Sequence, residues 1–144
     1  MITVAFYKGR TTRLDRFIQW YTGGPYSHVE IMAGRIAVGD TAFSFSASGR
    51  DGGVRMKLIT FNPEHWDMVH IDRDPWPIIE AATDECDLKY DYLNAVLLDH
   101  GNRFTRWLGR HRWYCNEFVA DLLGLPAPYG SPSSLADRVK TLQQ

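Results

Sequence analysis

Hydrophobic residues in the first half of the chain follow the short patterns that are typical of β-strands. The first apolar, β-prone run, residues 2–7, predicts a strand. Five later segments are predicted as strands on the same grounds: residues 26–32, 36–38, 42–47, 54–61 and 66–71. An Asn-Pro pair at residues 62–63 marks a tight connection before the last of them. Because these strands are too closely spaced for helical crossovers, we expect an antiparallel meander.

A helical period separates the first two predicted strands. Apolar residues recur there at i, i+3, i+4 and i+7, which predicts an amphipathic helix with one apolar face. The side chains on that face are Leu14, Phe17, Ile18 and Tyr21. Thr11 and Thr12 are candidate N-caps, Asp15 suits the first turn, and the Thr-Gly-Gly-Pro run at residues 22–25 ends the helix.

The second half of the chain is predicted to be helical. The predicted helices are residues 78–88, residues 90–100, residues 115–123 with Gly124 as C-cap, and a last helix from Ser131-Pro132 to about residue 142. Strands followed by helices predict an α+β fold. The 144 residues contain no repeat and no long linker, so we expect a single domain over residues 1–144.

Composition and charge narrow the class of protein. Hydrophobic residues make up 44% of the chain and aromatic residues 13%, and the net charge is −1, which favours a globular core over disorder or general nucleic-acid binding. Nine acidic and two basic residues lie in residues 64–91, whereas residues 103–112 hold four arginines and no acidic residue. Both clusters are interpreted as solvated faces, or the second as a cationic wall beside Cys115.

No segment predicts a membrane span or a targeting signal. No apolar run approaches the ~20 residues that cross a bilayer. The first residues lack the basic region and long apolar stretch of a signal peptide, so we expect a cytoplasmic protein whose cysteines, Cys86 and Cys115, form no disulfide scaffold. Glycine-rich phosphate loops are absent, and the spacing of His65 and His70 does not suit zinc. We therefore expect no cofactor and no metal.

Cys115 is the candidate nucleophile. It lies where an arginine-rich segment gives way to the predicted helix 115–123. A helix start presents unpaired N–H groups and a partial positive charge, which favour the thiolate that nucleophilic catalysis requires. The same N–H groups can bind the oxyanion of an acyl-transfer intermediate. The alternative is a buried structural cysteine.

His28 is the candidate base. Strand alternation places His28 and Glu30 on one face and Val29 and Ile31 on the other. A histidine on a strand and a cysteine at a helix start form a nucleophile and base if the sheet packs on that helix, whatever their separation in sequence. The alternative is a surface histidine whose ring has no catalytic role.

Two segments resemble a known family. Ser-His-Val-Glu at residues 27–30 and Tyr-Cys-Asn-Glu-Phe-Val at residues 114–119 are similar to the circularly permuted branch of the NlpC/P60, papain-like cysteine hydrolase superfamily, with its YiiX-like and LRAT-like members. In that branch the histidine precedes the cysteine, as it does here. The resemblance extends to residues 48–55 and 90–93. It implies an antiparallel half-barrel sheet packed against the cysteine helix, and a bacterial or phage source.

The resemblance also implies the roles of the site residues. Cys115 attacks a carbonyl, and His28 takes the thiol proton and later returns it to the leaving group. A third polar residue then orients the imidazole, and Glu30 is favoured because it shares the face of His28. The alternatives for this third residue are Asp40, on or near the next strand, and the serines Ser44 and Ser46.

Three functions remain open at this point. The first is an amidase or peptidase acting on a small peptide such as a cell-wall peptide. The second is a lipid acyltransferase or thioesterase, for which an exposed apolar patch or a membrane-binding helix is expected, and the sequence shows neither clearly. The third is a non-catalytic binding module. The expected partner is a small peptide or acyl substrate, not nucleic acid, and the oligomeric state does not follow from the sequence.

Overall fold

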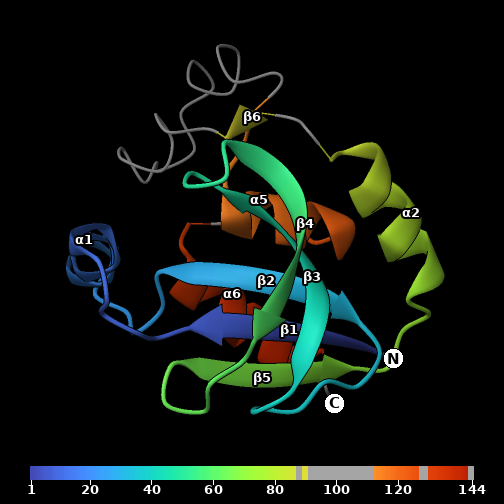
Figure 1. The fold of residues 1–144 in the computed structure, drawn as a ribbon, viewed down its shortest axis with the longest axis horizontal. Coiled ribbons are helices and arrows are strands. Elements are labelled where there is room, and N and C mark those ends of the chain that lie inside the picture. Colours follow the sequence, from blue (N-terminus) through green and yellow to red (C-terminus); the bar gives the residue numbers. More distant parts are fainter. Residues whose placement is uncertain (87–88, 91–111, 127–129, 143–144) are drawn as a thin grey trace.

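Five antiparallel strands in the order β5-β1-β2-β3-β4 form the centre of the fold (Figure 1). The computed structural model describes residues 1–86, 89–90, 112–126 and 130–142. The five strands are β1 (Ile2–Tyr7), β2 (His28–Ala33), β3 (Thr41–Ser48), β4 (Gly53–Thr60) and β5 (Trp66–Ile71). Beyond β4 lie two short strands that pair in parallel, β6 (Lys89–Tyr90) and β7 (Arg112–Trp113).

Four helices lie in the described part of the chain. They are α1 (Arg13–Thr22), α2 (Trp76–Asp84), α5 (Cys115–Leu122) and α6 (Pro132–Thr141). None of these helices is both long enough and apolar enough to span a bilayer, which agrees with the expectation of no transmembrane segment. The antiparallel sheet together with these helices confirms the predicted α+β class.

Strand β1 lies inside the sheet and is buried on both faces. It pairs with β2 on one side and with β5 on the other. Val4 and Phe6 face the core beneath the helices, whereas Ala5 faces a second, smaller core on the opposite side of the sheet. Tyr7 at the end of β1 is opposite His28 at the start of β2, so this ladder sets the position of His28.

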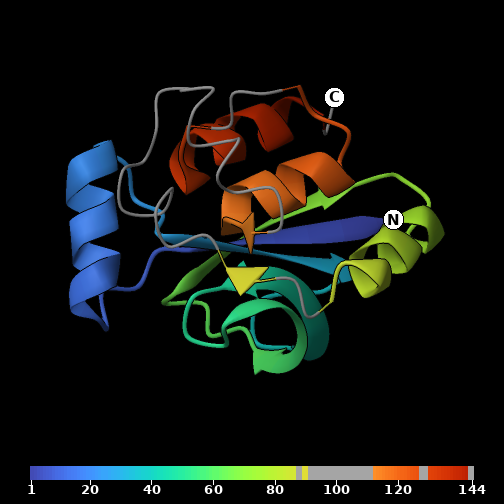
Figure 2. The same cartoon turned by 90° about the horizontal axis from the view of Figure 1, so that it is seen from above.

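The predicted meander is right for β2, β3 and β4 but wrong for β5. Strand β5 pairs with β1 at the far edge of the sheet, although only residues 61–65 separate it from β4. Figures 1 and 2 show that β3 and β4 curve strongly, which brings the end of β4 toward β5. Phe61 is fully buried in this bend, and its ring centroid lies 5.1 Å from that of Trp66. Sheet curvature, which the sequence pattern does not reveal, explains the short connection.

Helices α5 and α6 cover one face of the sheet (Figure 2). Helix α5 contacts β2 and β3, and its buried residues Phe118 and Val119 belong to the main core. Gly124 follows α5 with a left-handed φ of 63°, a conformation that glycine adopts without strain. Ser131 caps α6, because its Oγ accepts the N–H of Ser134 at 3.2 Å. The predicted ends of both helices are confirmed to within one residue.

Helix α1 begins as predicted, with Thr12 as its N-cap. The Oγ1 of Thr12 accepts the N–H of Asp15 at 3.1 Å, and the Asp15 carboxylate accepts the N–H of Thr12 at 2.9 Å. This reciprocal pair is a capping box. Asp15 also accepts the hydroxyl of Ser27 at 3.1 Å, which ties the helix to the residue before His28.

The predicted apolar face of α1 is not the buried face, which corrects the sequence-based interpretation. Of its four side chains only Ile18 is buried, and the others are exposed. The helix instead buries Asp15 and Gln19. The amide of Gln19 donates to the backbone carbonyl of Gly9 at 3.0 Å, so polar contacts hold α1 beside the sheet. Periodicity identified the helix but not the side that packs.

Three other predicted segments differ from the structure or lie outside it. Residues 36–38 form no strand, because Asp40 accepts the backbone N–H of Ala37 at 2.9 Å and closes a turn. Helix α2 begins two residues before the predicted start and ends at Asp84, and residues 87–88 lie outside the described residues. In the predicted helix 90–100, Tyr90 belongs to β6, and residues 91–100 also lie outside the described part.

Candidate active site

Cys115 is the first residue of α5. Tyr114 before it has an extended backbone, with φ −101° and ψ 147°, and its carbonyl accepts the N–H of Phe118 at 2.9 Å. Phe118 and Val119 anchor the helix in the core against β2 and β3. The cysteine is therefore held at the junction of the helix start and the sheet, where its side chain is only 1% exposed.

His28 and Glu30 point to the same side of β2, as strand alternation predicts. The Nε2 atom of His28 lies 2.8 Å from Oε1 of Glu30. The side chain of His28 is 22% exposed, whereas that of Glu30 is 1% exposed. His28 also interacts with Cys115. Because Glu30 contacts Nε2, the ring nitrogen that remains for Cys115 is Nδ1. The structure thus brings together the three site residues that were predicted from the sequence.

The two partners of His28 change its ionisation. Burial by itself lowers the pKa of His28, but the charge of Cys115 and hydrogen bonds with Cys115 and Glu30 outweigh this effect and raise the pKa to about 10. Attraction to the Cys115 thiolate is the largest of the effects that raise it. The ring is therefore protonated at neutral pH when both partners carry their negative charge.

Arg55 is a candidate site residue to which the sequence pattern assigned no role. Its guanidinium binds both oxygens of Glu30, with Nη1 2.7 Å from Oε2 and Nη2 2.5 Å from Oε1. Asp51 accepts the Nε–H of Arg55 at 3.0 Å, and Lys57 donates to the same carboxylate at 3.1 Å. Alternation alone places Arg55 and Lys57 on one face of β4. That this face of β4 contacts Glu30 follows only from the order and curvature of the strands, which the sequence pattern does not reveal.

Arg55 and His28 keep Glu30 ionised. Burial by itself raises the pKa of Glu30, but hydrogen bonds from Arg55 and His28 outweigh it and lower the pKa to about 2. A carboxylate with so low a pKa does not take the ring proton at neutral pH. It accepts a hydrogen bond from His28 and thereby sets the orientation of the imidazole.

Asp40 lies at the wrong end of β3 to contact His28. It precedes the strand, and its carboxylate accepts a backbone N–H in the turn there. Ile31 is opposite Phe45, and this antiparallel register puts His28 at the level of Ser48, where β3 ends. Asp40 is therefore about 25 Å away along the strand. The structure does not bring this alternative third residue to the site.

The two serines that were alternatives are bonded to backbone groups of neighbouring strands. Ser46 donates to the carbonyl of Val29 at 2.6 Å. Ser44 donates to the carbonyl of Lys57 at 3.3 Å. Both hydroxyls therefore bond to neighbouring strands. The side chain that contacts Nε2 of His28 at 2.8 Å is that of Glu30.

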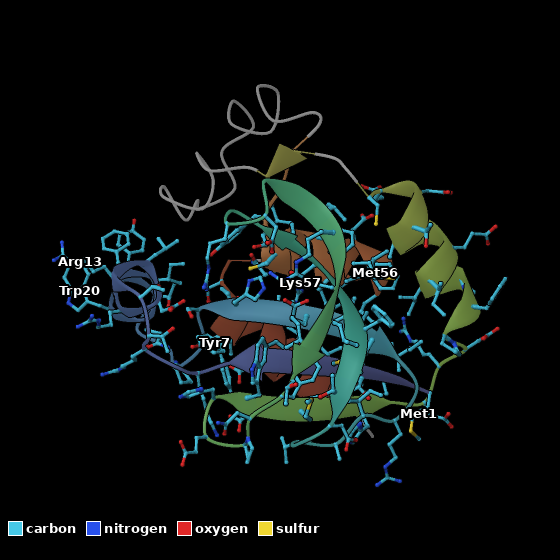
Figure 3. All side chains as sticks on the ribbon, viewed as in Figure 1. Met1, Tyr7, Arg13, Trp20, Met56 and Lys57 are labelled. Atoms are coloured by element: carbon cyan, nitrogen blue, oxygen red, sulfur yellow. The ribbon has the colours of Figure 1, made fainter. Side chains whose placement is uncertain are left out.

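A cavity of about 550 Å³ adjoins His28 and Glu30. One part of its wall is apolar and consists of Tyr7, Leu14, Ile18, Ile59 and Trp66. Another part is charged and includes Arg50, Asp51, Arg55 and Lys57. Figure 3 shows Tyr7 and Lys57 on the side of β4 that faces α1. The cavity can accept a ligand with an apolar portion and a polar or charged one.

Cys115 does not belong to the described residues that line this cavity. His28 does line it, whereas Cys115 is buried and only 1% exposed.

The remaining chemical expectations concern charge and metals. The predicted cationic wall falls on residues 103–112, whose side chains lie outside the described part of the chain. Within the described residues, no group of three or more His, Cys, Asp or Glu side chains could hold a metal ion. Neither Cys86 nor Cys115 forms a disulfide.

Comparisons with known proteins found no relative of this chain. The chain matches no protein-family model and no curated protein, and its fold matches no solved structure.

Proposed function

We propose that the protein is a cysteine hydrolase in which Cys115 is the nucleophile, His28 is the general base and acid, and Glu30 orients His28. The observation that carries this proposal is the position of the His28 ring between Cys115 and Glu30, whose Oε1 lies 2.8 Å from Nε2. A nucleophile, a base and a group that orients the base are the arrangement on which nucleophilic catalysis depends.

The fold assignment belongs to the same proposal. A strongly curved antiparallel sheet, with the helix that bears the cysteine packed on β2 and β3, supports a permuted papain-like fold of the NlpC/P60 type. The order of His28 before Cys115 in the chain agrees with the permuted branch.

The first half of the reaction forms an acyl-enzyme. Transfer of the thiol proton to His28 gives an imidazolium beside a thiolate, and the sulfur of this thiolate attacks the substrate carbonyl, so that a C–S bond forms and the carbonyl oxygen becomes an oxyanion. The partial positive charge at the start of α5 stabilises that oxyanion. The intermediate then collapses, the bond to the leaving group breaks, and His28 returns its proton to that group.

The second half releases the acid. A water molecule gives a proton to His28 and attacks the thioester carbonyl, the C–S bond breaks, and the proton passes to the Cys115 sulfur. Glu30 remains ionised throughout, because Arg55 binds both of its oxygens. It holds Nδ1 toward the sulfur and stabilises the imidazolium in both halves.

One observation favours acyl groups over peptides as the substrate. Helix α1 exposes Leu14, Phe17, Trp20 and Tyr21 beside a cavity whose wall is partly apolar. An exposed apolar face is the feature expected of the acyltransferase or thioesterase alternative. The test therefore compares an acyl substrate with a peptide substrate.

The test uses two chromogenic substrates, p-nitrophenyl octanoate and a peptide p-nitroanilide, with intact-mass measurement of the protein. We expect wild-type protein to gain an octanoyl group on Cys115 and to release p-nitrophenolate. Release should fall by roughly 10²–10⁴-fold in His28→Ala, because the general base is removed. Turnover of the ester without the anilide assigns an acyl substrate, and turnover of both assigns an amidase or peptidase.

Cys86→Ser is the matched control, since it removes the other cysteine of the chain and leaves Cys115, His28 and Glu30 unchanged. It should acylate like the wild-type protein, whereas Cys115→Ala should not acylate. The nucleophile assignment fails if the octanoyl group is found on Cys86, or if Cys115→Ala releases p-nitrophenolate at the wild-type rate.

A further inference from the structure

The outer face of α1 carries large apolar side chains that are exposed to solvent. Trp20 is 76% exposed, Leu14 49%, Tyr21 47% and Phe17 39%. Phe17 lies between the other two rings, with centroid distances of 6.1 Å to Trp20 and 5.9 Å to Tyr21. We call these four exposed side chains on one ten-residue helix the α1 patch.

The charge around the α1 patch is positive. Arg10, Arg13 and Arg16 are exposed on or just before the helix. Asp15 is the only acidic residue of α1, and it is buried in the capping box. No salt bridge joins these three arginines to an acidic residue in the described ranges. The patch therefore combines aromatic rings with the exposed Arg13 and Arg16, whereas the Nε–H of Arg10 donates to Oε1 of Gln19 on the inner side of the helix at 2.9 Å.

The α1 patch is not needed to hold the helix in place. The inner side of α1 is fixed by the burial of Ile18 and by the hydrogen bonds of Asp15 and Gln19. Figure 2 shows α1 standing at the side of the molecule, away from α5 and α6. Figure 3 shows Arg13 and Trp20 on the side of α1 that faces away from the sheet.

We propose that α1 docks the protein on the surface of an anionic lipid bilayer, with the α1 patch in the headgroup region. Trp and Tyr suit that depth because their rings are apolar and their N–H and O–H groups remain hydrated. Arginines beside them attract anionic headgroups. Charge complementarity thus selects an anionic surface over a neutral one.

A second copy of the chain is a poorer occupant of the same face. Two α1 patches placed together would bring the arginines of one copy against those of the other, and like charges repel. The patch is also a convex helix surface rather than a groove. A bilayer accepts a convex apolar face without any complementary shape.

Docking through α1 would bring the cavity next to the lipid. Leu14 belongs both to the α1 patch and to the cavity wall, and Ile18 on the inner side of the same helix lines the cavity as well. The docking surface and the cavity are therefore continuous. The docking proposal goes beyond the hydrolase assignment and does not depend on the chemistry of Cys115. Membrane docking can therefore be wrong while the hydrolase assignment is right, and the reverse.

The test is co-sedimentation of the full chain with vesicles of phosphatidylcholine alone, or of phosphatidylcholine with about one third phosphatidylglycerol. We expect the protein to sediment with the anionic vesicles at least about tenfold more than with the neutral ones, and to be released as salt shortens the reach of the charges. Equal sedimentation with both vesicles, or none with either, overturns the proposal.

Matched variants separate the α1 patch from general stickiness. Trp20→Ser should lose sedimentation, whereas Trp76→Ser removes an equally exposed Trp on α2, 69% exposed, and should keep it. The double variant Arg13→Gln, Arg16→Gln should also lose sedimentation, and Arg35→Gln, exposed on a loop, should not. Circular dichroism verifies that each variant is folded.

The alternative occupants give different results. If sedimentation velocity shows a wild-type dimer that Trp20→Ser dissolves, and vesicles bind neither protein, the face belongs to a second copy and membrane docking is wrong. Equal losses in Trp20→Ser and Trp76→Ser also overturn the proposal, because binding would then follow exposed tryptophan in general.

Discussion

Glu30 is a fully buried carboxylate that contacts a histidine on one side and an arginine on the other. A buried charge is costly unless it is paired and hydrogen-bonded, and Arg55 and His28 supply three bonds to its two oxygens. Arg55 is itself held by Asp51. This chain of charges fixes both the position and the ionisation of the group that orients His28.

The first prediction concerns Glu30. Glu30→Gln should lower turnover sharply, roughly 10²–10⁴-fold, because the amide neither stabilises the imidazolium nor enforces the same ring tautomer. Asp40→Asn is the matched control, since Asp40 lies at the other end of β3, and turnover should stay near the wild-type value. The rates with p-nitrophenyl octanoate measure both. Loss of turnover in Asp40→Asn alone would move the role away from Glu30.

Helix α1 illustrates how one element divides its tasks between two sides. Its inner side carries the capping box and the contacts to Ser27 and Gly9, and its outer side carries the α1 patch. Stability should therefore depend on the inner side, and surface binding on the outer side.

A second prediction follows for the stability of this element. Thr12→Ala removes the capping hydroxyl and should lower the free energy of unfolding by about 0.5–2 kcal/mol. Trp20→Ser should change it by less than about 0.5 kcal/mol, because the ring is 76% exposed. Urea unfolding followed by circular dichroism compares the two. A larger loss in Trp20→Ser than in Thr12→Ala would mean that the outer side is packed.

At the scale of the whole molecule, curvature of the sheet joins its parts. The bend through β3 and β4 brings β5 to β1, closes the second core around Phe61 and Trp66, and turns Arg55 toward Glu30. The site is therefore built from β2, β4 and α5, which lie far apart in the sequence. Its stability should follow the ionisation of the groups at its centre.

A third prediction gives the pH dependence of that stability. The pKa of His28 is raised from 6.5 to about 10, so its contribution is complete below pH 6.5 and is lost as pH rises toward 10. The pKa of Glu30 is lowered from 4.5 to about 2, so its contribution is complete above pH 4.5 and is lost as pH falls toward 2. Together they stabilise the fold most between about pH 4.5 and 6.5.

Urea unfolding of the wild-type protein and of His28→Gln across pH 5 to 10 measures the alkaline part of this dependence. The variant should be less stable throughout but should lose less stability between pH 6.5 and 10, because it has no proton to release there. Parallel curves for the two proteins would show that the alkaline loss arises from other groups.

Several features of the fold follow from local sequence patterns. The capping residues Thr12 and Ser131, the glycine after α5 and the strand at Trp66–Ile71 depend on neighbours in the chain, and the structure agrees with each. The α+β class follows from the same patterns. Alternation along β2 also placed His28 and Glu30 on one face, because the side chains of a strand point alternately to its two sides.

Other features were decided only by the tertiary structure. The partner of β5, the buried side of α1 and the contact of Arg55 with Glu30 each depend on how distant segments are placed in space. A helical period shows that a helix has an apolar face, but whether that face is buried depends on which surface the rest of the chain presents. At α1 the neighbouring surface offers backbone carbonyls and a serine hydroxyl, so Asp15 and Gln19 turn inward and the aromatic residues remain in solvent.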